Sequence, residues 1–299
     1  MDGLGGLLII DKAGGMTSHD VVSRCRRLLR TKKIGHAGTL DPMATGVLVL
    51  GVDRATKLLG LLAPTSKAYR ATIRLGQATS TDDAEGEVVA TTPAGHVTDS
   101  DIAARIAEST GDIDQVPATV SAIKVNGERA YARHRAGEDV RLPARPVTVS
   151  RFDVLARRDV GDFVDLDVSI ECSSGTYVRA LARDLGAALT VGGHLTGLRR
   201  TRVGSFTLDE ARTLDELASA AESGRQLLSL DMDRAVRTAF VCRDIDDAQA
   251  EDLRNGRWLE PVGISGVYAA VDPAGQAIAL VRESGRRAAS VMVVRPATR

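Results

Sequence analysis

The sequence predicts an α+β protein that ends in a small β-rich domain. Along residues 1–238, segments with the pattern of strands alternate with amphipathic segments typical of helices. From Phe240 onward the pattern changes to short strands around one helix, over about sixty residues. A chain of 299 residues is long enough for one large domain and one small one. We therefore predict domains at 1–238 and 239–299.

Two kinds of strand are expected in the larger domain. The run Val47–Val52 is apolar throughout, which is typical of a strand covered on both faces. The segment Lys67–Gly76 alternates apolar and polar residues, as a half-buried strand does. Three further segments have strand patterns: Leu7–Asp11, Val147–Ala156 and Phe163–Cys172.

Helical spacing of apolar residues predicts the helices. The first follows a cap at Thr17 or Ser18 and has an apolar face made of Val21, Val22, Cys25, Leu28 and Leu29. Further helices are predicted at 98–109, at 178–189 and through the acidic segment 209–237. In the smaller domain we expect strands at 240–245, 266–272, 277–283 and 288–295, with a helix near 246–254.

Charge is balanced overall but segregated along the chain. Lys plus Arg and Asp plus Glu both number 39, which argues against a general polyanion binder. Residues 24–33 nevertheless contain six basic side chains and no acid, whereas 209–252 contain twelve acids and five arginines, a local balance of −7. The basic segment has two open interpretations: a solvated helix end favoured by the helix dipole, or a surface that binds nucleic acid.

Several classes of protein are not expected. The three cysteines lie far apart and the five histidines do not cluster, so we predict neither a disulfide framework nor a metal site. The N-terminal apolar run has only four residues, and no stretch approaches the ~18 apolar residues of a membrane span. We expect a cytoplasmic protein without membrane contact, and a monomer because no interface pattern is evident.

One carboxylate, Asp41, lies in a glycine-rich turn directly before the apolar strand at 47–52. Pro42 fixes its own φ and disfavours the helical region for Asp41, so the loop should have a defined shape. Rigid scaffolds commonly present catalytic groups on such loops. An ordinary Asp-Pro turn is the alternative interpretation.

The stretch Gly35–Leu48 follows the pattern G-H-x-G-x-L-D-P-x-A-x-G-x-L and resembles the signature of the TruB family of tRNA pseudouridine synthases. The resemblance implies that Asp41 is the catalytic aspartate. It also implies that His36 fills the space that a flipped nucleotide leaves in the tRNA T loop. The family's early K-P-x-G turn corresponds to 12–15, where Lys12 is carried over as a substrate-binding residue and alanine replaces the proline.

A second block, at 67–86, resembles the family in K-x-Y-x-x-x-x-x-L-G and the polar turn that follows it. The resemblance places Tyr69 where the family has the tyrosine that stacks on the target base. From the residue pattern alone, a tyrosine in a strand is usually a core residue.

Two further blocks follow in the family's order. Residues 172–181 match C-S-x-G-T-Y-[VI]-R-x-L, which implies that Arg179 pairs with the catalytic aspartate and that Tyr177 lies at the substrate. Residues 192–204 match G-x-H-x-x-x-L-R-R-x-x-x-G, which implies that Leu198 lines the base pocket.

The segment 115–146 is locally basic and weakly apolar, and composition alone permits a solvated excursion. Its QVP-x-x-x-SA-x-K-x-x-G stretch and the later ARP resemble the family's RNA-gripping insertion. That resemblance places Lys124, Tyr131 and Arg145 nearest the site. The last sixty or so residues have the size of the PUA domain that the family carries at this end.

Taken together, these blocks imply a mixed, largely antiparallel sheet flanked by helices, in an enzyme that isomerises uridine 55 in the T loop of tRNA. The T arm of tRNA would be its partner, with no cofactor, metal or guide RNA. An arginine beside Asp41 would keep the carboxylate ionised, so that it acts as nucleophile or base rather than as a proton donor. The alternatives are a non-catalytic tRNA-binding or folding protein and a guide-dependent synthase. A hydrolase is less consistent with the sequence, because no second carboxylate has acid/base spacing.

Overall fold

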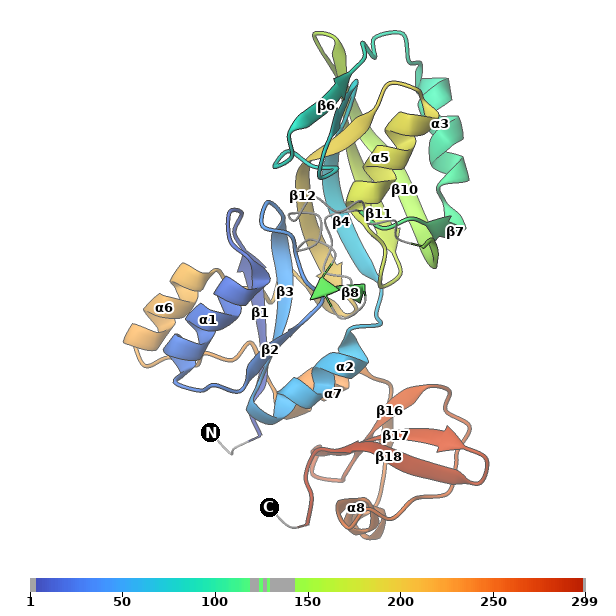
Figure 1. The fold of residues 1–299 in the computed structure, drawn as a ribbon. Coiled ribbons are helices and arrows are strands. Elements are labelled where there is room, and N and C mark those ends of the chain that lie inside the picture. The colour runs from blue at the N-terminus through green and yellow to red at the C-terminus, as the bar shows by residue number, and fades with distance from the viewer. Residues whose placement is uncertain (1–3, 119–123, 126–127, 130–142, 298–299) are drawn as a thin grey trace.

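The computed structural model describes residues 4–118, 124–125, 128–129 and 143–297 (Figure 1). A large sheet has the strand order β14-β1-β3-β12-β4-β11-β10-β7, with β2 also paired to β3 and β13 to β12. Its strands are β1 (Gly6–Lys12), β2 (Ile34–Ala37), β3 (Thr45–Val52), β4 (Lys67–Leu75), β7 (Gly111–Gln115), β10 (Arg145–Val160), β11 (Phe163–Cys172), β12 (Gly193–Val203), β13 (Phe206–Thr207) and β14 (Leu230–Asp231).

Most ladders of this sheet are antiparallel, whereas β12 runs parallel to β3. Two small hairpins lie outside it, β5 (Gln77–Thr79) with β6 (Val88–Thr91) and β8 (Lys124–Val125) with β9 (Glu128–Arg129). The helices of this part are α1 (Ser18–Leu29), the 3₁₀ helix η1 (Asp53–Leu58), α2 (Leu59–Leu62), α3 (Asp99–Glu108), α5 (Val178–Ala188), α6 (Leu214–Glu222) and α7 (Met232–Ala239).

The β1–β3 half of the sheet is covered on both faces, as its apolar strands predict. Side chains of β1 and β3 alternate between two cores, so that Leu48 and Leu50 lie on one face and Val47 and Val49 on the other. Helices α1 and α6 cover the first face, and η1, α2 and α7 cover the second (Figure 1). This strand pair is therefore a rigid support for the loop that precedes β3.

The β4–β11–β10 half is covered on one face only. Helices α3 and α5 pack on that face, and the burial of β4 alternates along its length as predicted. The opposite face is polar, with Arg74 bonded to Asp165 at 2.8 Å across the strands.

The structure corrects two predictions. The segment 209–237 does not form continuous helix, because the chain turns at Gly224 with φ +64° and then pairs with β1 through Leu230 as the edge strand β14. Residues 34–37, which precede the Asp41 turn, form the strand β2 rather than part of a loop. The α1 cap is confirmed at Thr17, where a capping box with Asp20 satisfies the first backbone donors.

The C-terminal module is a four-stranded sheet, β15 (Cys242–Asp244), β16 (Val267–Val271), β17 (Ala277–Ser284) and β18 (Arg287–Val293), with one helix, α8 (Asp247–Arg254). One face has its own core around Tyr268, and the other joins the core under α7. Arg295 also bonds both carboxylate oxygens of Asp233 at 2.7 Å, and that carboxylate accepts the backbone N–H of Ala277. The predicted α+β fold with a small β-rich C-terminal module is thus confirmed.

No helix in the part of the chain that the structure describes is long and apolar enough to cross a membrane.

Candidate active site

Asp41 lies where the large sheet divides. At its start β3 pairs with β12, through Thr45 and Gly46, and from Val49 onward it pairs with β2. The loop 38–44 spans this division. Gly46 has φ +100°, and a Cβ there would lie 2.1 Å from the carbonyl oxygen of Arg200, so only glycine allows β3 and β12 to approach this closely.

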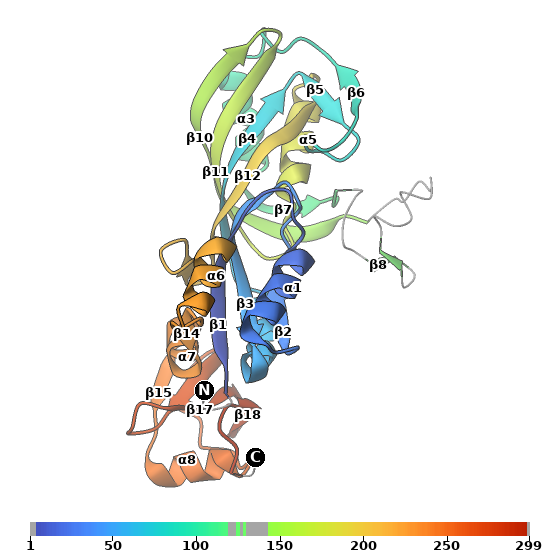
Figure 2. The same cartoon turned by 90° about the vertical axis from the view of Figure 1, so that its left-hand side faces the viewer.

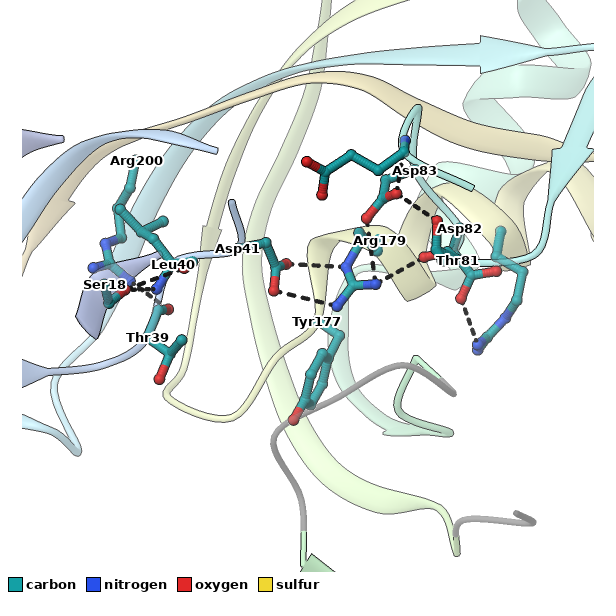
Figure 3. Close-up of polar contacts among 12 residues, drawn as sticks. Ser18, Thr39, Leu40, Asp41, Thr81, Asp82, Asp83, Tyr177, Arg179 and Arg200 are labelled. Atoms are coloured by element: carbon teal, nitrogen blue, oxygen red, sulfur yellow. Dashed lines mark hydrogen bonds and ion pairs between the residues drawn. The ribbon is translucent and has the colours of Figure 1, made fainter. Parts of the chain in front are cut away.

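Arg200 holds both ends of this loop. Its Nε donates to the carbonyl of Val47 at 2.7 Å, and its two Nη atoms donate to the carbonyls of Gly38 and Thr39 at 3.0 and 3.3 Å (Figure 3). The side chain is fully buried. A single guanidinium therefore links strand β12 to the residues on either side of Asp41.

Ser18 and Lys12 hold the middle of the loop. The Ser18 hydroxyl accepts from the N–H of Leu40 at 2.9 Å and donates to its carbonyl at 3.1 Å. The Lys12 ammonium donates to the Pro42 carbonyl at 3.0 Å and to two carbonyls of the 13–16 turn. Burial lowers the pKa of Lys12 to about 8. Lys12, expected at the substrate, lies under the loop with no exposed surface.

Arg179 binds Asp41 with two nitrogens. Nε lies 3.0 Å from Oδ2 and Nη2 lies 3.3 Å from Oδ1 (Figure 3). The arginine side chain is 5% exposed, whereas that of Asp41 is 36% exposed and faces solvent at the cavity. The predicted pair is thus brought together, with the carboxylate on the accessible side.

A second carboxylate, which the sequence did not reveal, binds the same guanidinium. Asp83 lies 3.3 Å from Nη1 of Arg179 and is 4% exposed, and Nη1 also donates to the Thr81 carbonyl at 2.8 Å. Asp83 further accepts from the Thr81 hydroxyl and the Glu85 N–H. Arg179 stands in the first turn of α5, where the helix dipole disfavours a cation, so two carboxylates compensate for its placement. The two adjacent acids in the 79–86 turn were the available signal.

A cavity of about 240 Å³ opens beside Asp41. This is below the roughly 300–1,000 Å³ of pockets for drug-sized ligands, which suits one planar base. Strands β4 and β12 supply its floor, and the loops 38–41 and 174–177 supply its rim. The lining residues are Gly38, Thr39, Leu40, Asp41, Lys67, Tyr69, Ser174, Gly175, Thr176, Tyr177, Val178, Arg179, Leu198 and Arg200.

Two titratable residues of the floor are shifted by burial. Burial raises the pKa of the Tyr69 phenol, and the positive charge of Arg200, its register partner on β12, opposes that rise. Burial lowers the pKa of Lys67 to about 8, with the Arg200 charge adding to the effect. The Lys67 ammonium donates to the carbonyls of Ala63 and Thr65. Lys67 was not predicted, because charged residues in alternating strands usually face solvent.

The other predicted residues are distributed as follows. Tyr177 lines the cavity, and its backbone N–H and carbonyl are both bonded by the Gln115 side chain. His36 is half-buried on β2 and does not line the cavity, and burial lowers its pKa. Arg145 is exposed at the start of β10, opposite Gln115.

Two predicted residues belong to the segment 115–146. Lys124 lies in the short strand β8, whose side chains are not described, and Tyr131 lies outside the described residues. Among the residues that are described, no group of three or more His, Cys, Asp or Glu side chains is placed to hold a metal ion.

Comparison with known families accounts for nearly the whole chain. Residues 26–178 match the TruB family pseudouridylate synthase N-terminal domain. Residues 179–237 match the tRNA pseudouridylate synthase B C-terminal domain, and residues 240–295 match the C-terminal part of tRNA pseudouridine synthase II.

Curated relatives and solved structures agree with this result. The chain is 73% identical to the tRNA pseudouridine synthase B of Nocardia farcinica over 296 residues, covering 99% of this chain and 95% of that protein. It is 69% identical to the protein of that name from Rhodococcus jostii, covering 98% and 95%. Its fold resembles a chain of a Cbf5-Nop10-Gar1 complex, with a TM-score of 0.75, 25% identity and coverage of 98% and 86%. A chain of an H/ACA RNP bound to a substrate RNA gives a TM-score of 0.74 at 25% identity, covering 99% and 87%. The chain therefore belongs to the TruB family of pseudouridylate synthases.

Proposed function

We propose that this protein is a tRNA pseudouridine synthase that isomerises uridine 55 in the T loop of tRNA. The observation that carries the proposal is the two-nitrogen contact from buried Arg179 to accessible Asp41 at the rim of a cavity of about 240 Å³. The identity of 73% to a curated tRNA pseudouridine synthase B supports the choice of RNA.

The reaction breaks the bond from N1 of uracil to C1′ of the ribose and forms a bond from C5 to C1′. The base rotates between these steps, C5 loses its proton, and N1 gains one, so no atom is gained or lost overall. Asp41 either attacks C1′ as a nucleophile or removes a ribose proton as a base. Both roles require the ionised carboxylate that Arg179 stabilises.

The cavity residues receive roles from their positions. Tyr69 stacks on the extruded uracil, and Leu198 excludes water from it. Burial raises the pKa of Tyr69, so its phenol is protonated near neutral pH, which favours stacking over proton removal from C5. Tyr177 stands at the cavity rim beside the substrate. Asp83 positions Arg179 from the side opposite Asp41.

The remaining predicted parts concern RNA binding. Residues 1–238 form the catalytic unit, and 239–299 form a PUA-like unit. The segment 115–146 grips the RNA arm through Lys124, Tyr131 and Arg145. Its ends leave and rejoin the sheet side by side, because Gln115 and Arg145 are register partners. His36 contributes beyond the cavity by filling the place vacated in the T loop.

The RNA partner is tRNA alone, without a guide, and the chain acts as a monomer in the cytoplasm. The structural relatives include Cbf5 complexes and an H/ACA RNP, so a guide-dependent reaction is the alternative to be tested. A non-catalytic tRNA-folding protein is the other alternative. The ion pair on an accessible carboxylate favours catalysis over both binding alone and loss of chemistry.

Tritium release from an unmodified tRNA transcript that carries [5-³H]uridine tests the proposal, with purified protein and no guide RNA or cofactor. We expect about one equivalent of tritium per tRNA, with the product mapped to position 55. Asp41→Asn should bind the transcript with an affinity within about threefold of wild type and release no tritium. Turnover by that variant would refute the role of Asp41. Tight binding without release by the wild type would favour the folding protein, and release that needs added guide RNA would favour the guide-dependent class.

A further inference from the structure

The C-terminal end of α1 carries an exposed group of cations that the catalytic proposal leaves unused. We call it the α1 basic patch and define it as Arg27, Arg30, Lys32 and Lys33, all of which are exposed. No ion pair joins any of these four side chains to an acid within the described part of the chain. By contrast, many exposed arginines elsewhere are paired, as Arg157 is with Asp99 at 2.7 Å.

Helix stabilisation explains only part of this patch. The helix dipole favours cations in the last turn, where Arg27 lies. The dipole effect fades beyond that turn, and Lys32 and Lys33 lie after the helix has ended at the left-handed Arg30. Adjacent like charges on one surface repel each other by a few tenths of a kcal/mol per pair. The cluster therefore costs stability unless an anion binds it.

The position of the patch relates it to the catalytic loop. The N-terminal residue of α1, Ser18, bonds Leu40, the neighbour of Asp41. Twelve residues of helix span about 18 Å, so the patch lies at roughly that distance from the loop along α1. Figure 2 shows α1 running along the outside of the sheet toward the C-terminal module. Phosphates bound here would belong to a different part of the RNA from the flipped nucleotide.

We infer that the α1 basic patch binds the phosphate backbone of tRNA outside the T-arm hairpin. The inference rests on the proposed function, since it takes tRNA as the substrate. Four cations without protein partners on a long polyanion would act mainly through release of counterions, which makes binding depend on salt. The patch would contribute to affinity for whole tRNA and leave the chemical step unchanged, because none of its side chains lines the cavity.

The test replaces the four residues together, as Arg27→Gln, Arg30→Gln, Lys32→Gln and Lys33→Gln. Equilibrium binding is measured in an Asp41→Asn background, against both a whole tRNA transcript and a T-arm hairpin, between 50 and 200 mM salt. The slope of log K against log salt should fall by about 0.7 to 0.9 per lost contact for whole tRNA. At four contacts, the affinity lost over that fourfold rise in salt should be roughly 50- to 150-fold smaller than in the parent. The hairpin slope should not change.

A matched control replaces two exposed arginines of the acidic segment, Arg225→Gln and Arg234→Gln, which should leave both slopes unchanged. An unchanged slope for whole tRNA in the fourfold variant would overturn the inference. An equal loss on the hairpin would also overturn it, by placing the patch on the T arm. Single-turnover tritium release at saturating enzyme, with Asp41 intact, separates the two proposals. Absence of release from the wild type counts against the proposed function, whereas normal release with unchanged slopes counts against the patch alone.

Discussion

Arg179→Lys keeps a positive charge beside Asp41 and removes the planar contact that fixes the carboxylate. In the native site, Nε and Nη2 bind the two oxygens of Asp41 at 3.0 and 3.3 Å, while Nη1 lies 3.3 Å from Asp83 and 2.8 Å from the Thr81 carbonyl. An ammonium is a compact charge that cannot reproduce this fork. It would hold at most one oxygen of Asp41 and leave Asp83 with a weaker partner.

The expected cost follows from those contacts. Loss of one charge-assisted hydrogen bond to Asp41 removes about 1.5–3 kcal/mol. If that contact positions the carboxylate in the transition state, the chemical step slows by roughly 10- to 150-fold. Affinity for tRNA should stay within about threefold, because Arg179 is almost fully buried. A lower Tm is also expected, since the buried carboxylate of Asp83 loses part of its compensation.

Single-turnover tritium release with saturating enzyme measures the chemical step directly, and filter binding measures affinity. Arg183→Lys is the matched control, because Arg183 lies one turn further along α5 and bonds Asp82 and the Val116 carbonyl instead of Asp41. That control should slow the step by less than about threefold. A rate for Arg179→Lys above half that of wild type would refute the claim that the planar contact matters.

Three further predictions concern stability, each measured by urea unfolding. Gly46→Ala should destabilise the fold by more than ~2 kcal/mol and abolish turnover, because its Cβ would lie 2.1 Å from the Arg200 carbonyl oxygen. Gly60→Ala, with no atom within 4 Å of its Cβ, should stabilise by up to ~1 kcal/mol, and equal effects of the two changes would contradict the steric argument. Lys67 has a folded pKa of about 8 against 10.5, so the folded state loses its proton first as pH rises. Wild type should therefore gain stability over Lys67→Met above pH 8, by on the order of 2 kcal/mol at pH 9.5, and a difference independent of pH would rule this out. Asp233→Ala should cost ~1.5–3 kcal/mol and separate the unfolding of the C-terminal module from the rest, since Arg295 and the Ala277 N–H lose their shared partner. A single transition with an unchanged midpoint would show that the apolar contacts alone join the two parts.

The elements that local pattern determines were predictable from the sequence. Thr17 and Asp20 stand three residues apart before an apolar helical face, and the capping box forms as that spacing predicts. The apolar run of β3 is buried on both faces, and the alternation of β4 is that of a half-buried strand. In each case the residues that decide the structure are neighbours in the chain.

Features that depend on distant partners were not predictable in the same way. The segment 209–237 has a helical composition throughout, but it is interrupted where Leu230 pairs with Leu7, more than 200 residues earlier. Asp41 and Arg179 lie 138 positions apart, and only the resemblance to a known family suggested their pairing. Asp83 escaped prediction because an acid in a polar turn has no distinctive pattern until Arg179 is placed against it.

The buried cations show why composition alone could not describe this site. Lys12, Lys67 and Arg200 are nearly or fully buried around the Asp41 loop, and their side-chain nitrogens bond backbone carbonyls. Burying a charge without a carboxylate partner is costly, so their placement is explained by what the bonds hold, namely the loop that presents Asp41. Carbonyl oxygens cannot neutralise these charges, and the region around the cavity therefore retains a positive potential. That potential favours the ionised form of Asp41 and attracts a polyanionic substrate, so the contacts that fix the loop also prepare its chemistry.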